Sequence, residues 1–268
     1  MRALALALLL VGTVASAQDV RLFAAGSLRP VMTEIGAAYA KDTGVKVVGE
    51  FGPSGLLRDR LAKGEQADVF ASANMEHPQA LAAAGRAGPV RMFTRNRLCA
   101  LVSPRLSVSG GTLLGYMLDP AVKLGISTPK ADPSGDYAWA VFAKAEAVKP
   151  GARAALEARA LQLTGGPKSP PPPKDRSVYG MLVESGQADI FLTYCTNAVV
   201  AQREVPALSI VSLPPELAVG ADYGLTVLTG ASPQAAGFVE FVMSPAGQNI
   251  LGRHGFDTMR APSSERRP

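Results

Sequence analysis

The chain has 268 residues, of which 47% are hydrophobic and 18% charged, and its formal net charge is +5. This composition is typical of a globular protein and excludes a disordered one, because it supplies enough apolar side chains for a core. No basic block is interleaved with aromatic residues, so binding to nucleic acid is not indicated.

The N-terminal segment has the pattern of a secretory signal peptide. Residues 1–17 contain a basic residue at Arg2, then an apolar stretch, and then an Ala-Ser-Ala cleavage site at residues 15–17. The apolar stretch is too short to span a bilayer as a stable helix. We therefore expect a cleaved signal peptide and an exported mature protein.

Two similar strand–turn–helix patterns follow, and each carries one serine in its turn. Residues 20–25 form a predicted strand that ends at Ser27, and apolar residues then recur at helical spacing. Residues 45–51 form a second predicted strand, and the turn Gly-Pro-Ser-Gly around Ser54 precedes another helical stripe. We predict that both serines occupy helix N-cap positions at the carboxyl ends of neighbouring strands.

This placement has a chemical consequence. A helix N-terminus presents unpaired N–H groups and a partial positive charge. Two such termini at the carboxyl edge of a parallel sheet form a site for an anion. The simpler interpretation is that Ser27 and Ser54 only cap their own helices. The repetition of the pattern favours the anion site.

The middle of the chain continues the alternation of strands and helices. A third turn of the same kind contains Ser134 and opens a helix, and a proline-rich connector follows at residues 164–174. The pattern predicts strands at 67–74, 97–103 and 124–127, and helices at 78–84, 112–117, 137–145 and 154–163.

The last third of the chain completes the pattern. A helix begins near Val178 and ends before Gly186, and the strand that follows ends at Tyr194. The pattern predicts further strands at 208–213 and 222–228, one long helix at 235–251, and a polar tail at 261–268 that we expect to be mobile.

Alternating strands and helices predict an α/β protein with mainly parallel sheets flanked by helices. The interrupted strand order predicts two lobes with the ligand in the cleft between them. We assign residues 18–97 plus 215–268 to lobe I and residues 98–214 to lobe II. The crossings, at residues 97–99 and near Pro214, would let the lobes close around a ligand.

The sequence contains two cysteines, Cys99 and Cys195. An even number of cysteines in an exported protein favours a disulfide. Both also lie in apolar, strand-like segments, where a free cysteine is an ordinary buried residue. The sequence is therefore compatible with a disulfide between the two cysteines and also with two buried free thiols.

The ordered set of motifs resembles the molybdate-binding proteins of ABC importers. The resemblance covers nearly all of the mature chain and rests on these segments: FAAGSL, FGPSG, ADVFASA, DPSG, RSVYG and the apolar strand that ends in Tyr194. It implies a periplasmic, monomeric solute-binding protein that delivers molybdate or tungstate to a membrane permease. It implies no catalytic activity and no cofactor.

The resemblance also implies a ligand set for the oxyanion. Ser27 and Ser54 would come from lobe I, and Ser134, Val178 (through its N–H) and Tyr194 from lobe II. Molybdate, tungstate and sulfate are fully deprotonated at neutral pH and need only donors, which suits such a set. Phosphate carries a proton and needs an acceptor.

Two acids near the third turn bear on this choice. A carboxylate facing a dianion is unfavourable, so Asp132 and Asp136 must point away if the ligand is a dianion. Asp136 falls in the first turn of a helix, where an acid is stabilising, and we predict that it faces away from the ligand. An inward acid would favour phosphate.

The sequence supports other functions less strongly. A carrier of sulfate, phosphate or another anion is the main alternative. A hydrolase would need a histidine base, and no motif places His77 or His254 beside Ser54. A metal-binding protein would have to collect residues without ligand spacing, namely Glu76, His77, Asp132, Asp136 and Asp175.

Overall fold

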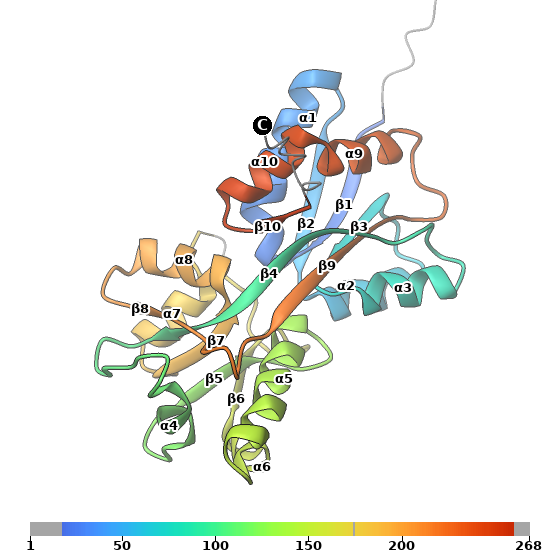
Figure 1. The fold of residues 1–268 in the computed structure, drawn as a ribbon. Coiled ribbons are helices and arrows are strands. Elements are labelled where there is room, and N and C mark those ends of the chain that lie inside the picture. Colours follow the sequence, from blue (N-terminus) through green and yellow to red (C-terminus); the bar gives the residue numbers. More distant parts are fainter. Residues whose placement is uncertain (1–17, 174, 260–268) are drawn as a thin grey trace, which may run out of the picture.

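The computed structural model describes residues 18–173 and 175–259, so the predicted signal peptide and the predicted mobile tail lie outside the described residues. Two α/β halves lie on either side of long strands that run through the middle of the molecule (Figure 1). Within the described residues, no helix is long and apolar enough to cross a bilayer.

The first half contains a parallel three-stranded unit. Strand β1 (Val20–Ala25) lies between β2 (Val47–Gly52) and β3 (Val69–Ser72). Because side chains alternate along β1, Leu22 and Ala24 pack in one core while Phe23 packs in another with Leu57. The helices of this half are α1 (Arg29–Thr43), α9 (Gln234–Met243) and α10 (Pro245–Arg253) on one face, and α2 (Ser54–Ala62) and α3 (Glu76–Ala83) on the other.

The second half repeats this arrangement. Strand β5 (Leu124–Ser127) lies between β6 (Leu161–Thr164) and β7 (Ile190–Tyr194), with parallel pairing on both sides. Leu192 faces one core and Phe191 the other. The helices are α4 (Leu113–Leu118), α5 (Pro133–Val148) and α6 (Ala152–Arg159) on one face, and α7 (Val178–Glu184) and α8 (Cys195–Glu204) on the other.

Strand β4 (Arg91–Val102) connects the two halves (Figure 1). Its residues up to Arg97 pair with β9 (Gly220–Val227) and, at two positions, with β10 (Asp257–Thr258). Its residues from Leu98 pair with β7 and β8 (Ser209–Ser212). The strand therefore changes partners between Arg97 and Leu98, and the chain returns to the first half between β8 and β9.

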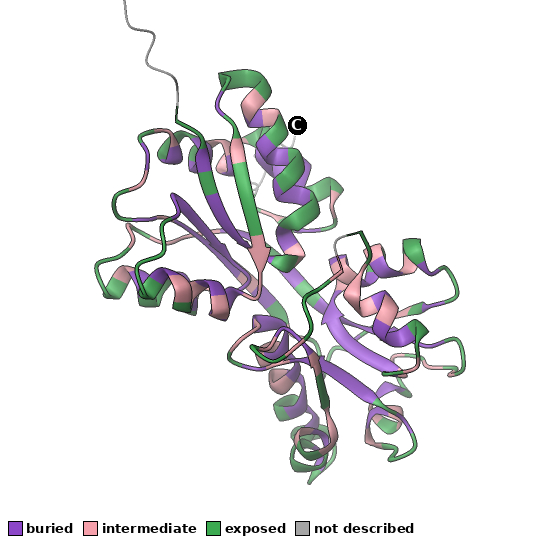
Figure 2. Cartoon of the chain, turned by 180° about the vertical axis from the view of Figure 1, so that it is seen from behind, coloured by how far each residue is buried: buried purple, intermediate pink, exposed green. Residues whose placement is uncertain are grey.

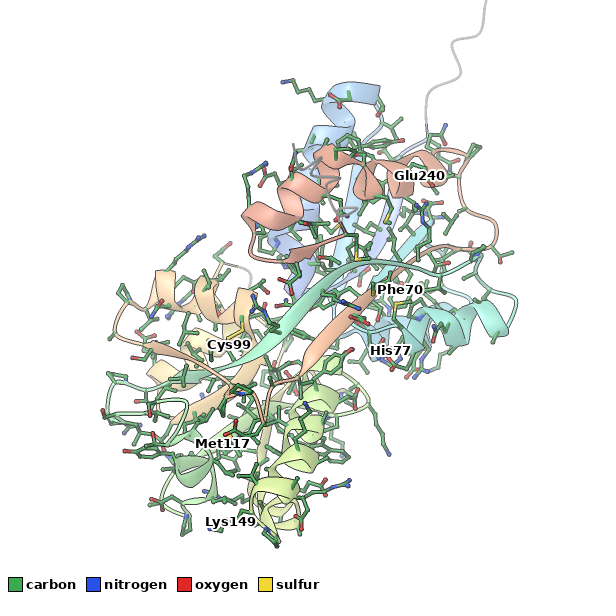
Figure 3. All side chains as sticks on the ribbon, viewed as in Figure 1. Phe70, His77, Cys99, Met117, Lys149 and Glu240 are labelled. Atoms are coloured by element: carbon green, nitrogen blue, oxygen red, sulfur yellow. A yellow bond between two sulfur atoms is a disulfide. The ribbon has the colours of Figure 1, made fainter. Side chains whose placement is uncertain are left out.

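The α/β class is confirmed, and the central pairings add a feature that was not predicted. The pairs that β4 makes with β7, β8, β9 and β10, and the pair of β3 with β9, are antiparallel. Figure 2 shows that most strands are buried, with the edge strand β2 as an exposed exception, while the helices expose their outer faces. Side chains fill both halves, with Phe70 buried in the first and Met117 in the second (Figure 3).

Two predicted helices were wrong in part, and one helix was missed. Residues 161–163, predicted as the end of a helix, belong to the edge strand β6 (Leu161–Thr164), whose first two side chains are exposed. Helix α8 was not predicted, because it starts directly after a strand without a turn residue. The single long helix is two helices, because Ser244 caps α10 with Pro245 at its first position.

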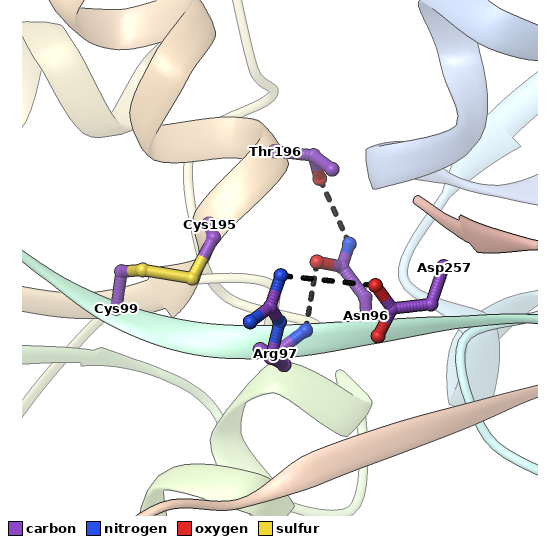
Figure 4. Close-up of a disulfide and its surroundings, with 6 residues drawn as sticks. All are labelled: Asn96, Arg97, Cys99, Cys195, Thr196 and Asp257. Carbon is purple, nitrogen blue, oxygen red and sulfur yellow. Dashed lines mark hydrogen bonds and ion pairs between the residues drawn. A yellow bond between two sulfur atoms is a disulfide. The ribbon is translucent and has the colours of Figure 1, made fainter. Parts of the chain in front are cut away.

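Cys99 of β4 and Cys195 of α8 form a disulfide, which settles the open question about the cysteines (Figure 4). Close by, Asn96 Nδ2 donates a 2.8 Å hydrogen bond to Thr196 Oγ1. These two links fix the start of α8, and with it the preceding Tyr194, to the strand that joins the halves.

Candidate binding cleft

A cleft of about 580 Å³ lies between the two halves, and both of them line it. This volume falls within the range of about 300–1,000 Å³ that is typical of small-molecule sites. Its walls include the ends of β1, β2 and β7, the starts of α2 and α7, and the proline-rich segment before α7. Among the lining residues are Ser27, Arg29, Phe51, Ser54, Ala73, Asp132, Val178, Tyr179, Tyr194 and Glu204.

The structure brings four of the five predicted ligand residues to this cleft, namely Ser27, Ser54, Val178 and Tyr194. Ser134 does not line it. The Ser134 side chain is fully buried at the start of α5, and its backbone N–H donates a 3.0 Å hydrogen bond to Asp132 Oδ1. Asp132 is the N-cap of α5, so it occupies the helix N-terminus that Ser134 was predicted to offer to a ligand.

The prediction that Ser27 and Ser54 are N-caps was wrong. Ser27 lies inside a short 3₁₀ helix, η1 (Gly26–Leu28), and Ser54 is the first residue of α2, after the N-cap Pro53. Proline fixes its own backbone at φ −59° and so moves the helix start forward by one residue. Both hydroxyls are therefore free to bond elsewhere.

Each serine hydroxyl is oriented by one partner. Ser54 Oγ accepts a 3.1 Å hydrogen bond from the N–H of Ala73, and Ser27 Oγ lies 2.9 Å from the hydroxyl of Tyr223 and hydrogen-bonds with it. Because Ser54 Oγ is used as an acceptor, its own hydrogen remains for a ligand. An anion in the cleft can thus receive a hydrogen bond from Ser54.

Tyr194 reaches across the cleft from β7. Its hydroxyl donates a 3.4 Å hydrogen bond to the Ala73 carbonyl, and its ring lies 5.5 Å from that of Tyr223. Burial raises the pKa of Tyr194 and of Tyr223 well above the usual tyrosine value, so both phenols stay protonated and remain donors. Tyr223 was not predicted to belong to the site, because alternation in its strand shows a buried face but not what it contacts.

The two acids of the third turn behave differently. Asp136 does not line the cleft, and its Oδ1 accepts a 2.8 Å hydrogen bond from the N–H of Lys130, so the prediction that it faces away is confirmed. Asp132 does line the cleft. Burial raises the pKa of the Asp132 carboxyl to about 6, although the hydrogen bond from the Ser134 N–H lowers it.

Charged residues at the cleft were not predicted either. Arg29 lies over the Phe51 ring, 4.9 Å from its centroid, and Arg176 forms a 2.7 Å ion pair with Glu184. Glu204 Oε2 accepts a 2.7 Å hydrogen bond from the N–H of Ser177. Both cations thus have partners on the protein, and the predicted ligand residues supply neutral hydrogen-bond donors.

The candidate histidine and metal sites lie elsewhere. Neither His77 nor His254 lines the cleft, and His254 Nε2 is 2.7 Å from Glu34. His77 is only 8% exposed, and burial lowers its pKa to about 4, so it is neutral near pH 7. In the described part of the chain, no group of three or more metal-binding side chains comes together.

The sequence matches a protein family over most of its length. A model of the family described as bacterial extracellular solute-binding protein matches residues 20–257. The chain is 35% identical to an uncharacterised protein of Pasteurella multocida, over 88% of this chain and 97% of the relative. It is 29% identical to the molybdate-binding protein ModA of Mycobacterium bovis, over 91% of this chain and 87% of that protein.

Solved structures share the fold at lower identity. The periplasmic molybdate-binding protein of Azotobacter vinelandii has a TM-score of 0.72 at 18% identity, over 90% of this chain and 100% of that one. The sulfate-binding protein SubI of Mycobacterium tuberculosis has a TM-score of 0.73 at 17% identity, over 91% and 88%. At this identity the likeness concerns the fold, which is that of periplasmic binding proteins.

Proposed function

Because this chain belongs to the bacterial extracellular solute-binding protein family, we propose that it captures molybdate or tungstate in the periplasm and delivers the oxyanion to an ABC permease. The observation that carries this proposal is the convergence of Ser27, Ser54, Val178 and Tyr194 on one cleft from both halves. The chain acts as a binding protein in this proposal and has no catalytic role.

The chemistry of the cleft supports an oxyanion as the ligand. Ser54 has a hydroxyl hydrogen available for a ligand, and the hydroxyls of Ser27 and Tyr194 become donors to a ligand when they turn away from Tyr223 and from the Ala73 carbonyl. The N–H groups of Val178 and Tyr179, at the start of α7, have no partner within the helix. Neutral donors with fixed partners stabilise an anion without requiring an ion pair. The 29% identity to a molybdate-binding protein favours molybdate within this class.

One observation favours a second class of ligand, an oxyanion that carries a proton. Asp132 lines the cleft, and an ionised carboxylate there can accept a hydrogen bond from an oxyanion that carries a proton, such as hydrogen phosphate. The same fold also serves a protein named as sulfate-binding. Sulfate and phosphate are therefore the comparison ligands.

Thermal unfolding of the mature protein against a panel of oxyanions tests the proposal. A ligand present at about 100 times its dissociation constant adds about 2.7 kcal/mol to the free energy of unfolding. We expect molybdate and tungstate to raise the melting temperature more than sulfate, phosphate or divalent metal ions. A larger shift with phosphate or with a metal ion would replace this proposal.

A further inference from the structure

The Asp132 carboxyl is held in one orientation on the wall of the cleft. Its Oδ1 accepts the N–H of Ser134 at 3.0 Å. Its Oδ2 lies against Gly165, where a Cβ atom would be only 2.6 Å away. Gly165 has φ +78°, a backbone conformation that favours glycine. The missing side chain also leaves room for the Asp132 carboxyl. The hydrogen bond to Ser134 and the contact with Gly165 therefore fix the position of the Asp132 carboxyl.

The groups around Asp132 do not neutralise a charge on it. The ionisable groups that interact electrostatically with Asp132 are Asp136 on α5, Tyr179 on α7 and Tyr194 on β7. Asp136 is a like charge, and both phenols are neutral because burial raises their pKa. Among the described residues Asp132 forms no ion pair, and the charged residues elsewhere on the cleft wall are Arg29, Asp175, Arg176 and Glu204.

An ionised Asp132 and a dianion cannot share this cleft at low cost. At contact distance and the effective dielectric of a protein, their repulsion weakens binding by several orders of magnitude. Protonating an acid one pH unit above its pKa weakens binding only about tenfold. A dianion therefore binds the form of the protein in which the Asp132 carboxyl is protonated and neutral.

We propose that Asp132 is a further ligand-binding residue of the cleft and that it binds the oxyanion as a neutral carboxylic acid, which donates its O–H to a ligand oxygen. This inference rests on the proposed function. Above the pKa of Asp132, the proton comes from solvent, so one proton enters the complex with each oxyanion. No bond of the oxyanion breaks. Oxyanion capture by this protein is thus coupled to proton uptake, and affinity decreases as pH rises.

The proton-coupled role has a quantitative signature. With a pKa of about 6 in the free protein, the apparent affinity for molybdate decreases about fiftyfold between about pH 6 and about pH 8. Calorimetric titrations with molybdate at about pH 8, in two buffers with different ionisation enthalpies, count the protons taken up. We expect about one proton per site in the wild-type protein.

The Asp132→Asn variant tests whether the Asp132 carboxyl takes up the proton when the ligand binds. Asparagine is a good N-cap, and its amide can donate to the ligand without a proton from solvent. We expect the variant to take up no proton, to lose the pH dependence, and to bind molybdate more tightly than wild type at about pH 8. Asp136→Asn, outside the cleft, is the matched control and should keep the wild-type proton uptake.

Two outcomes would overturn the inference, and only the first of them leaves the proposed function intact. One is molybdate binding without proton uptake in the wild-type protein. The other is tight binding of phosphate by the wild-type protein that Asp132→Asn abolishes, because the carboxylate would then be an acceptor. If no oxyanion binds to the wild-type protein or to either variant, the proposed function itself fails.

Discussion

The N–H of Gly55, in the first turn of α2, donates a 2.9 Å hydrogen bond to the carbonyl of Ala131, in the loop before α5. This bond joins the two halves of the molecule beside the cleft. A Cβ atom on Gly55 would lie 2.4 Å from the carbonyl oxygen of Lys130 and 2.7 Å from that of Ala131. Only glycine permits this approach of the two backbones.

Gly55→Ala should therefore force the halves apart. We expect molybdate affinity to decrease more than about tenfold, because the donors of the two halves no longer converge. Small-angle scattering with molybdate present should also give a larger radius of gyration than wild type. Gly115→Ala is the control, because a Cβ there meets nothing within 4 Å. Wild-type affinity and radius in Gly55→Ala would show that this contact does not set the closed geometry.

Ser54→Ala should weaken molybdate binding by about 1.5–3 kcal/mol, because it removes a hydrogen bond to a charged ligand. It also leaves the N–H of Ala73 without its present partner. Isothermal titration calorimetry measures the change directly. Ser185→Ala, at the end of α7, should bind as wild type does. Equal affinities for both variants would mean that Ser54 has only a structural role.

Removing the disulfide should cost stability and ligand affinity together. The bond joins residues 96 positions apart, and a loop of about this length corresponds to about 4.7 kcal/mol in the chain-entropy model. The Cys99→Ser/Cys195→Ser double variant should show this loss in urea unfolding. It should also bind molybdate more weakly, because Tyr194 directly precedes Cys195. A stability change below about 1 kcal/mol would contradict the prediction.

His77 should make the fold less stable in mild acid. Its pKa in the folded protein is about 4, against 6.5 for a solvent-exposed histidine, so the unfolded chain takes up a proton first as the pH falls. The free energy of unfolding should decrease below about pH 6.5, by at most about 3 kcal/mol near pH 4. Asp132 acts in the opposite direction, because its pKa is raised.

A variant isolates the histidine contribution. His77→Gln keeps the backbone N–H that donates to Asn74 Oδ1 at 3.3 Å, and it removes the titrating ring. The difference in free energy of unfolding between wild type and this variant should shrink as the pH falls from about 7 to about 4.5. A difference that stays constant over this range would show that His77 does not titrate as its burial implies.

Local patterns were enough to predict most of the strands, although not β6 or β10. Residues 20–25 were predicted as a strand and form one, and Tyr194 was predicted as the end of a strand and is one. In these segments hydrophobic alternation and turn residues act over a few positions. The antiparallel pairing of β4 with β9 joins residues far apart in the chain, and no local pattern encodes it.

The site shows the same limit. Ser27 and Ser54 were predicted from local strand–turn–helix patterns, and Val178 and Tyr194 from the family resemblance; all four line the cleft. Asp132 lies in the same turn as Ser134. Ser134 was predicted as a ligand residue and Asp132 was expected to point away from a dianion, but Asp132 is the one that lines the cleft. Their roles are decided by the N-cap geometry of α5 and by the close approach of Gly165.

Anomalous diffraction at the molybdenum absorption edge, from crystals grown with molybdate, tests the central claim most directly. The account predicts one strong anomalous peak in the cleft, within hydrogen-bonding reach of Ser27, Ser54, the N–H of Val178 and Tyr194 through the ligand oxygens. A peak at another place on the protein, or a cleft without a peak at saturating molybdate, would contradict it.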